Sequence, residues 1–241
     1  MEPTRTVALE GFHAVKHALR FAPELVEEVT VTDLAATRTL SDDLAPDITE
    51  ALLGLANLGD VDHPTGVRAV ARRPVEDRTV LAHRTSPLVV VDDPRHPGTA
   101  GAVIRVAAAA GASGVAMTGA LDPWHPAVLR GSAGLHYALP VLRTTAAELA
   151  GPVLVLDADG DDLGVLPDDA ILVVGSERAG VGPDLRARAD AVVRLPMRAG
   201  VSSLNLATAT AAALYAWRLR QPSGPSDHRR SPSARRTPGR Q

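Results

Sequence analysis

The chain has 241 residues, of which 45% are hydrophobic and 22% charged. This composition is typical of one large or two small globular domains and excludes a fully disordered chain. The sequence contains no cysteine, which excludes disulfides, thiolate metal sites and a cysteine nucleophile and fits a reducing cytoplasm. The formal net charge is −3, so a basic nucleic-acid-binding surface over the whole molecule is excluded.

The sequence predicts neither a secretory signal nor a membrane span. Five glutamates interrupt residues 1–30, and the longest apolar stretch, residues 102–117, contains Arg105 and two glycines. Both stretches are therefore too polar for a signal or a spanning helix. We expect a soluble cytoplasmic protein.

Residues 1–85 are more polar and less regular than the segment that follows, and they predict a small α/β domain. The expected elements are a helix at 14–20, a strand at 26–32, a helix at 48–58 and a strand at 66–71. The charged segment 72–78 contains a proline, so we place the domain boundary between it and Pro87.

Residues 86–220 alternate short runs of Val, Leu and Ile with helical patterns. Strands are expected at 88–92, 114–118, 153–157, 171–175 and 191–195, and helices at 100–110, 126–132 and 203–219. Continuous apolar runs of this length indicate buried parallel strands, hence an α/β sheet covered on both faces. We expect Ser202 or Ser203 to cap the last helix. Residues 221–241 are rich in Pro, Ser and Arg and predict a disordered basic tail.

Three strand-to-helix turns combine glycines with polar residues. The turn at 93–105 ends with Arg105 in the following helix, the turn at 175–182 carries Glu177, and the turn at 195–205 contains Ser202, Ser203 and Asn205. Such turns allow a ligand to approach the backbone closely. Ordinary glycine-rich turns and a solvent-exposed helical arginine are the alternatives.

Other enzyme signatures are weak. The G-x-G-x-x-G and P-loop patterns are absent, so a nicotinamide-dependent oxidoreductase is only a remote alternative. The segment 131–134 lacks the G-x-S-x-G spacing of hydrolases. His13 and His17 lie one helical turn apart without a third ligand, so we expect no metal site.

Taken in order, the three turns and the segment Arg130-Gly-Ser-Ala-Gly134 resemble the SpoU/TrmH family of the SPOUT methyltransferases over residues 86–219. The resemblance implies a parallel sheet with a carboxyl-terminal trefoil knot and S-adenosylmethionine-dependent methylation of a ribose 2′-hydroxyl in RNA. It also implies a homodimer with sites near the interface, in which the helix at 203–219 is a candidate for pairing. The segments 11–15 and 63–67 resemble more loosely a substrate-binding domain found in this family, which favours ribosomal over transfer RNA.

The resemblance also implies roles for individual residues. The catalytic residues would be Arg105, Glu177, Ser203, Asn205 and Thr99; the methyl donor would be held by Thr118, Gly119, Gly175, Leu195, Met197 and Leu204; and RNA would contact Arg95, Arg130 and Ser132. Thr99 departs from the family, which usually has asparagine at this position. A SPOUT-fold protein that binds RNA with weak or no catalysis is therefore the alternative function.

Overall fold

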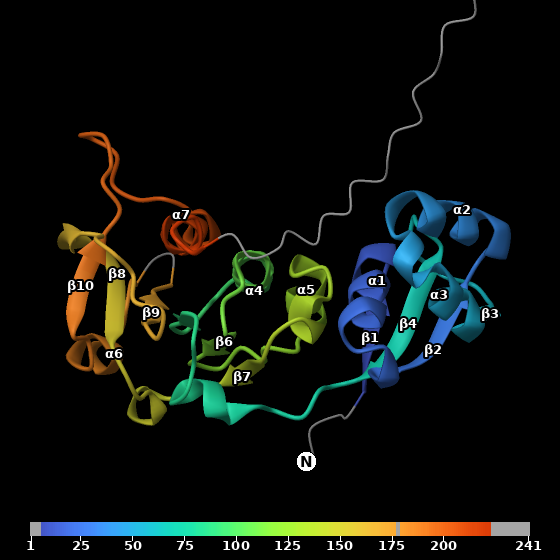
Figure 1. Cartoon of the computed structure of the whole chain (residues 1–241), viewed down its shortest axis with the longest axis horizontal. Helices are drawn as coiled ribbons and strands as arrows, with labels where there is room; N and C mark the ends of the chain where they lie inside the picture. Colours follow the sequence, from blue (N-terminus) through green and yellow to red (C-terminus); the bar gives the residue numbers. More distant parts are fainter. Residues whose placement is uncertain (1–5, 177–178, 223–241) are drawn as a thin grey trace, which may run out of the picture.

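The computed structural model describes residues 6–176 and 179–222. These residues form two α/β modules at opposite ends of the long axis of the molecule (Figure 1). We call residues 6–72 the amino-terminal module and residues 88–218 the carboxyl-terminal module. Glu177 lies outside the described residues, as does the predicted tail from residue 223 onwards.

The amino-terminal module contains a mixed sheet with the strand order β1-β4-β2-β3. The strands are β1 (Thr6–Glu10), β2 (Val26–Val31), β3 (Ala56–Leu58) and β4 (Val67–Arg72), and the helices are α1 (Phe12–Phe21), α2 (Leu34–Leu44) and α3 (Thr49–Leu55). β4 runs antiparallel to β1 and β2, whereas β3 is parallel to β2. Side chains of β4 alternate strictly between buried and exposed, as expected for a strand with one covered face.

The prediction of a helix at 48–58 is wrong for residues 56–58. α3 ends at Leu55, and residues 56–58 pair with Val29–Val31 as β3. Strand β1 and helix α2 were not predicted either. Helix α2 has few apolar residues, and it begins where the Asp33 carboxylate accepts hydrogen bonds from the backbone amides of Ala35 and Ala36.

The carboxyl-terminal module contains the predicted parallel sheet, with the strand order β10-β8-β9-β5-β6-β7. Its strands are β5 (Leu88–Val91), β6 (Gly114–Met117), β7 (Val141–Arg143), β8 (Val153–Asp162), β9 (Ile171–Val174) and β10 (Ala191–Arg194), and its helices are α4 (Pro97–Ala110), α5 (Pro126–Gly131), α6 (Pro183–Ala187) and α7 (Leu206–Arg218). Every residue of β5, β6 and β9 is buried, which confirms that both faces are covered. The knot stays a prediction.

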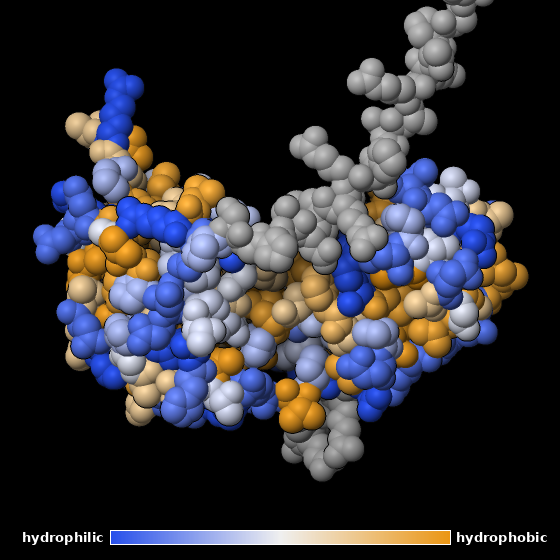
Figure 2. Space-filling model, viewed as in Figure 1, coloured by the Kyte–Doolittle hydropathy of each residue, from blue (hydrophilic) through white to orange (hydrophobic). Residues whose placement is uncertain are grey.

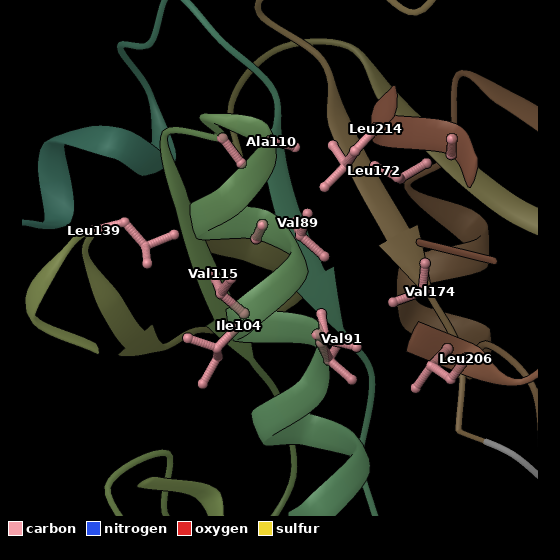
Figure 3. Close-up of a cluster of buried hydrophobic side chains, with 14 of the residues drawn as sticks. Val89, Val91, Ile104, Ala110, Val115, Leu139, Leu172, Val174, Leu206 and Leu214 are labelled. Carbon is pink, nitrogen blue, oxygen red and sulfur yellow. The ribbon is translucent and has the colours of Figure 1, made fainter. Parts of the chain in front are cut away.

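Successive side chains of β5 point into two different cores. Val89 and Val91 belong to the core beneath α4 and α7, whereas Leu88 and Val90 belong to the core on the opposite face. Figure 3 shows Ile104 of α4 near Val115 of β6, and Leu214 of α7 close to Leu172 of β9. Helices α4 and α7 therefore cover the same face of the sheet, and the start of α7 lies near the carboxyl end of β9.

The two modules share a core. Trp124, Leu129 and Tyr137 of the carboxyl-terminal module pack into the apolar cluster of the amino-terminal module. The Ala133 carbonyl lies 2.7 Å from His17 Nδ1 of α1. Because this joint is apolar and hydrogen-bonded, the modules hold each other in a fixed arrangement.

Polar side chains dominate the face seen in Figure 2, with apolar patches between them. None of the helices in the described part of the chain is long and apolar enough to cross a membrane.

Candidate active site

A pocket of about 450 Å³ opens beside the middle of β8 and the carboxyl end of β9. The middle of β8, the loops that follow β9 and β10, and the start of α7 form its walls. Six residues singled out from the sequence line it, namely Gly175, Leu195, Met197, Ser203, Leu204 and Asn205. Ligands of parallel α/β sheets bind at this edge, where the loops from several strands converge.

The backbone at Gly175 has no room for a side chain. A Cβ atom there would lie 2.2 Å from the carbonyl carbon of Gly180. The reason is that the loop folds back on itself, with Ser176 and Gly180 exchanging two backbone hydrogen bonds of 3.0 Å. Glycine at this position therefore lets the loop close tightly over one wall of the pocket.

Asn205 shapes the opposite wall by capping helix α7. Its Oδ1 accepts hydrogen bonds from the backbone amides of Ala207 at 3.0 Å and Thr208 at 3.3 Å. The expectation that Ser202 or Ser203 is the N-cap is wrong, because the helix begins at Leu206, three residues later than predicted. This frees both serines to line the pocket. The amino-terminal end of α7 also faces the pocket, which favours a negatively charged group there.

Asp157 is a pocket residue that sequence reasoning missed. It is the only charged residue among the described residues that line the pocket, and its carboxylate forms an ion pair with Arg186 of α6. Its side chain is 20% exposed. The signal was present in the sequence, because Asp157 directly follows the apolar run 153–156, and the end of a parallel strand is where ligand-binding residues gather.

Comparison with known proteins identifies the family. The SpoU rRNA Methylase family matches residues 86–215. The chain belongs to this family. It is similar to the 23S rRNA (uridine(2479)-2′-O)-methyltransferase of Streptomyces viridochromogenes, at 32% identity over 88% of this chain and 75% of the relative. It is also similar to the 23S rRNA (guanosine(2553)-2′-O)-methyltransferase RlmP of Bacillus subtilis, at 29% identity over 88% of both chains.

Solved structures of SpoU methyltransferases share the fold. One is AviRb from Streptomyces viridochromogenes in complex with AdoMet, with a TM-score of 0.71 and 25% identity over 89% of this chain and 90% of that one. Another is an AdoMet-bound rRNA methyltransferase from Sinorhizobium meliloti, with a TM-score of 0.70 and 26% identity over 91% of this chain and 89% of that one. Both modules are thus included in the similarity to these SpoU proteins.

Two predicted donor-binding residues do not line the pocket of this SpoU chain. Thr118 and Gly119 follow β6, which β5 separates from β9. They line a second cavity of about 310 Å³. There the Thr118 hydroxyl donates a hydrogen bond of 2.5 Å to the Asp92 carboxylate, whose second oxygen accepts from the Gly182 amide at 2.6 Å. Thr118 therefore ties β6 to β5 and, through Asp92, to the loop after β9.

Arg105 and Thr99 lie on α4, and no residue of α4 lines the pocket. Thr99 is half-buried in the first turn of the helix, whereas Arg105 is exposed one turn and a half later. The positive charge of Arg105 acts on the amino-terminal module, where it helps lower the pKa of both His13 and Lys16. Within one chain, the charge of Arg105 thus acts across the joint between the modules.

The three predicted RNA contacts differ in exposure. Arg95 and Arg130 are exposed and form ion pairs with Asp93 and Glu10. Ser132 is fully buried, and its hydroxyl lies 2.9 Å from the Leu129 carbonyl and 2.8 Å from His136 Nδ1. The prediction that Ser132 contacts RNA is therefore wrong, because its hydroxyl is held inside the joint.

Proposed function

We propose that this chain transfers the methyl group of S-adenosylmethionine to a ribose 2′-hydroxyl of ribosomal RNA. The single observation that carries the proposal is a glycine-lined pocket at the strand ends of a SpoU chain, where six residues expected from the sequence converge. Two relatives that resemble the chain over 88% of its length are named as 23S rRNA 2′-O-methyltransferases. These relatives favour ribosomal over transfer RNA as the substrate.

The pocket residues fit S-adenosylmethionine. Leu195, Met197 and Leu204 supply apolar walls that suit an adenine ring, and the absence of a side chain at Gly175 keeps the backbone close to the ligand. The Asp157 carboxylate suits the ammonium or ribose hydroxyls, and the start of α7 suits the carboxylate. When bound, the donor supplies an electrophilic methyl group on its sulfonium.

Residues of the chain must also position the ribose. We assign Arg105 to anchoring the phosphate beside the target ribose, because a guanidinium stays protonated in water and binds phosphate in a fixed geometry. Ser203 is exposed on the pocket wall, where its hydroxyl can contact the bound nucleotide. Asn205 is a positioning residue, because its side chain caps α7 and so fixes where the helix begins. The role of Glu177 stays a prediction.

We infer that a homodimer completes the site. The pocket and Arg105 do not meet within one chain, since no residue of α4 lines the pocket. A second copy that pairs through α7 would supply its Arg105 to the pocket of the first. Tyr215 and Leu219, at the end of α7, are 40% and 82% exposed, and such apolar side chains are typical of a subunit contact.

We also propose that three segments of the chain have different functions. Residues 1–85 would bind the RNA substrate, residues 86–220 would catalyse methyl transfer, and residues 221–241 would form a basic tail. The last strand of the first sheet ends at Arg72 and the first strand of the second begins at Leu88, which supports a boundary between them. Because the proposed substrate is ribosomal RNA, the reaction would take place in the cytoplasm.

The test is nucleoside mass spectrometry of ribosomal RNA from cells with and without the gene. The proposal expects one 2′-O-methylated nucleoside to fall in the deletion strain and to return with the wild-type gene. A parallel assay measures transfer of labelled methyl groups from S-adenosylmethionine to the unmodified RNA by the purified protein. If no nucleoside changes and no label is transferred, methyltransferase activity is contradicted.

One observation favours a second candidate function. Thr99 stands where the family usually has asparagine, and its hydroxyl lacks the reach and paired hydrogen bonds of an amide. An RNA-binding protein with weak catalysis would bind the donor and RNA but transfer methyl groups slowly. Normal turnover by the purified protein would exclude this candidate.

A further inference from the structure

The helices at the joint between the modules carry no acidic residue. In Figure 1, α4, α5 and α1 follow one another from the carboxyl-terminal to the amino-terminal module. All 28 acidic residues of the chain lie outside these three helices. By contrast, α1 contains His13, Lys16, His17 and Arg20, which are spaced so that they share one face of the helix. The joint is therefore basic, although residues 1–85 hold 14 acidic and only 9 basic residues.

Several of these basic side chains already have partners. Arg20 forms a bidentate pair with Asp47, Arg130 pairs with Glu10, and His17 contacts the Ala133 carbonyl. His13, Lys16 and Arg105 have neither an ion pair nor a side-chain hydrogen bond within residues 6–176 and 179–222. His13 and Arg105 are exposed and Lys16 is half-buried. We call these three residues the joint cluster.

The charges of the joint cluster act on one another. Burial lowers the pKa of His13, and the positive charges of Lys16 and Arg105 lower it further. Burial also lowers the pKa of Lys16, and the positive charges of Arg20 and Arg105 lower it further. The Asp47 carboxylate raises this pKa, but it is already bound to Arg20. Like charges at this range repel unless an anion is placed between them.

Small residues hold the cluster together. At Gly101 of α4 a Cβ would lie 2.7 Å from the Cα of Gly131, at the end of α5. At Gly134 a Cβ would lie 2.6 Å from the Ala14 carbonyl oxygen of α1. Both α4 and α1 therefore pack tightly against the same segment, residues 131–134. This packing holds α4 and α1 against one segment, and the charge of Arg105 on α4 acts on His13 and Lys16 of α1. Helices held in this way keep the three side chains on one joint before any ligand binds, which lowers the entropic cost of binding.

We propose that His13, Lys16 and Arg105 form one phosphate-binding site, which holds the RNA backbone across the joint next to the target nucleotide. The inference rests on the proposed RNA substrate and goes beyond it by assigning a contact to the otherwise acidic amino-terminal module. Phosphate suits the site because Lys16 and Arg105 are positively charged, His13 can take up a proton, and none of the three has a carboxylate partner among the described residues. Lys16 is the only lysine of the chain, and its flexible stem can follow the RNA backbone.

The test compares Lys16→Gln and His13→Gln with the control Arg38→Gln. Arg38 is an exposed arginine of α2, outside the three helices of the joint, and it pairs with Glu50. The probe is unmodified 23S rRNA transcribed in vitro, and its dissociation constant is measured by filter binding over a series of salt concentrations. We expect Lys16→Gln to weaken binding about fivefold to tenfold and to reduce the salt slope by about one. The control should bind as the wild type does, and Lys16→Arg should restore most of the affinity.

The contribution of His13 has its own signature. Phosphate favours the protonated imidazole, whereas Lys16 and Arg105 disfavour it in the free protein, so RNA binding takes up a proton at His13. Affinity should therefore rise as the pH falls from 8 to 6, and His13→Gln should flatten this dependence. Calorimetry with S-adenosylmethionine should give unchanged donor binding for both variants, which shows that they are folded.

Wild-type affinity and salt slope in both variants would overturn the inference. Displacement of the RNA by polyglutamate as efficiently as by unlabelled rRNA would also overturn it, because the site would then suit an acidic protein. RNA binding is measured without methyl transfer, so the two proposals fail separately. Weakened binding in a protein without activity would retain the phosphate site and contradict the proposed function, whereas normal activity with unaffected binding would do the reverse.

Discussion

The two modules use their sheets differently. In the carboxyl-terminal module three strands are buried along their whole length, so only the loops at the strand ends can meet a ligand. In the amino-terminal module β4 leaves every second side chain exposed and runs antiparallel to both of its neighbours, β1 and β2. A parallel sheet covered on both faces concentrates its functional residues at one edge, whereas a mixed sheet creates no such edge. The amino-terminal module therefore contributes through a helix face.

The modules also differ in how their charges are arranged. Most charges of the amino-terminal module lie away from α1 and are acidic in sum, yet the joint cluster is basic. At the pocket of the carboxyl-terminal module, Asp157 is the charged group among the described lining residues. The comparison teaches that the net charge of a module does not predict which ligand it binds. The following predictions test whether each module performs the step assigned to it.

The largest expected effect is that of Arg105→Ala. We expect kcat/KM for RNA to fall about 100-fold, as is typical when a group that positions the reacting atoms is lost. Donor affinity should stay at the wild-type value, because Arg105 is assigned to the RNA phosphate and not to the methyl donor. Methyl-transfer assays and calorimetry measure the two quantities, and Arg38→Ala is the control. Near-normal transfer by Arg105→Ala would remove its assigned role.

The buried residue His136 should make the protein less stable in acid. Burial lowers the pKa of His136 to about 4, from 6.5 in an unfolded chain. As the pH falls below 6.5, His136 binds a proton in the unfolded state but not in the folded state. The free energy of unfolding therefore decreases until the pH reaches about 4. The loss should reach about 3 kcal/mol.

Urea unfolding between pH 7.5 and 4.5 measures this dependence. Glutamine does not titrate, so His136→Gln should lose less stability than the wild type as the pH falls. His83 is exposed, and His83→Gln serves as the matched control. An equal pH dependence in wild type and His136→Gln would show that His136 is not the group responsible.

Gly175→Ala should damage the pocket and leave the joint intact. The new Cβ would meet the backbone of Gly180, so the loop must shift. Overpacking of this kind weakens donor binding about 30-fold. Gly164→Ala is the control, since no atom lies within 4 Å of a Cβ there. Calorimetry with S-adenosylmethionine compares the two variants, and equal affinities would mean that the loop tolerates the methyl group.

Asp157→Asn tests whether the Asp157 carboxylate contacts the methyl donor. Loss of a charge-assisted hydrogen bond should weaken S-adenosylmethionine binding about tenfold. Asp159→Asn removes a charge two residues away that does not line the pocket and should have no effect. If both variants lose affinity equally, the effect comes from the overall field and not from a direct contact.

The smallest expected effect is a gain. Thr99→Asn introduces the amide that the family usually has and should raise turnover about threefold, through one additional hydrogen bond to substrate or to a neighbouring loop. Single-turnover methyl transfer measures the rate at saturating donor. Thr99→Val, which keeps the shape but removes the hydroxyl, should lower it. Unchanged turnover in Thr99→Asn would mean that threonine replaces asparagine fully.

Local patterns predicted most of the carboxyl-terminal module. The runs at 88–92 and 171–175 contain the buried strands β5 and β9, because short runs of Val, Leu and Ile are typical of a strand with both faces covered. β1, β3 and α2 were missed because short edge strands and polar helices have weak periodicity, and tertiary pairing decides them. β3 shows this clearly, since its three residues continue a helical pattern but pair with β2.

The sequence by itself placed glycine-bearing turns after the predicted strands, and the ends of parallel strands share one edge. Its resemblance to the SpoU/TrmH family pointed to Gly175, Leu195, Met197 and Leu204, all of which line the pocket. Only the tertiary structure decided what lies between those ends: it places Asp157 in the pocket, buries Ser132, and turns Arg105 towards α1 and away from the pocket of its own chain. The physical reason is that periodicity fixes the face on which a side chain lies, whereas the order of strands and the close packing at Gly101 and Gly134 fix its neighbours.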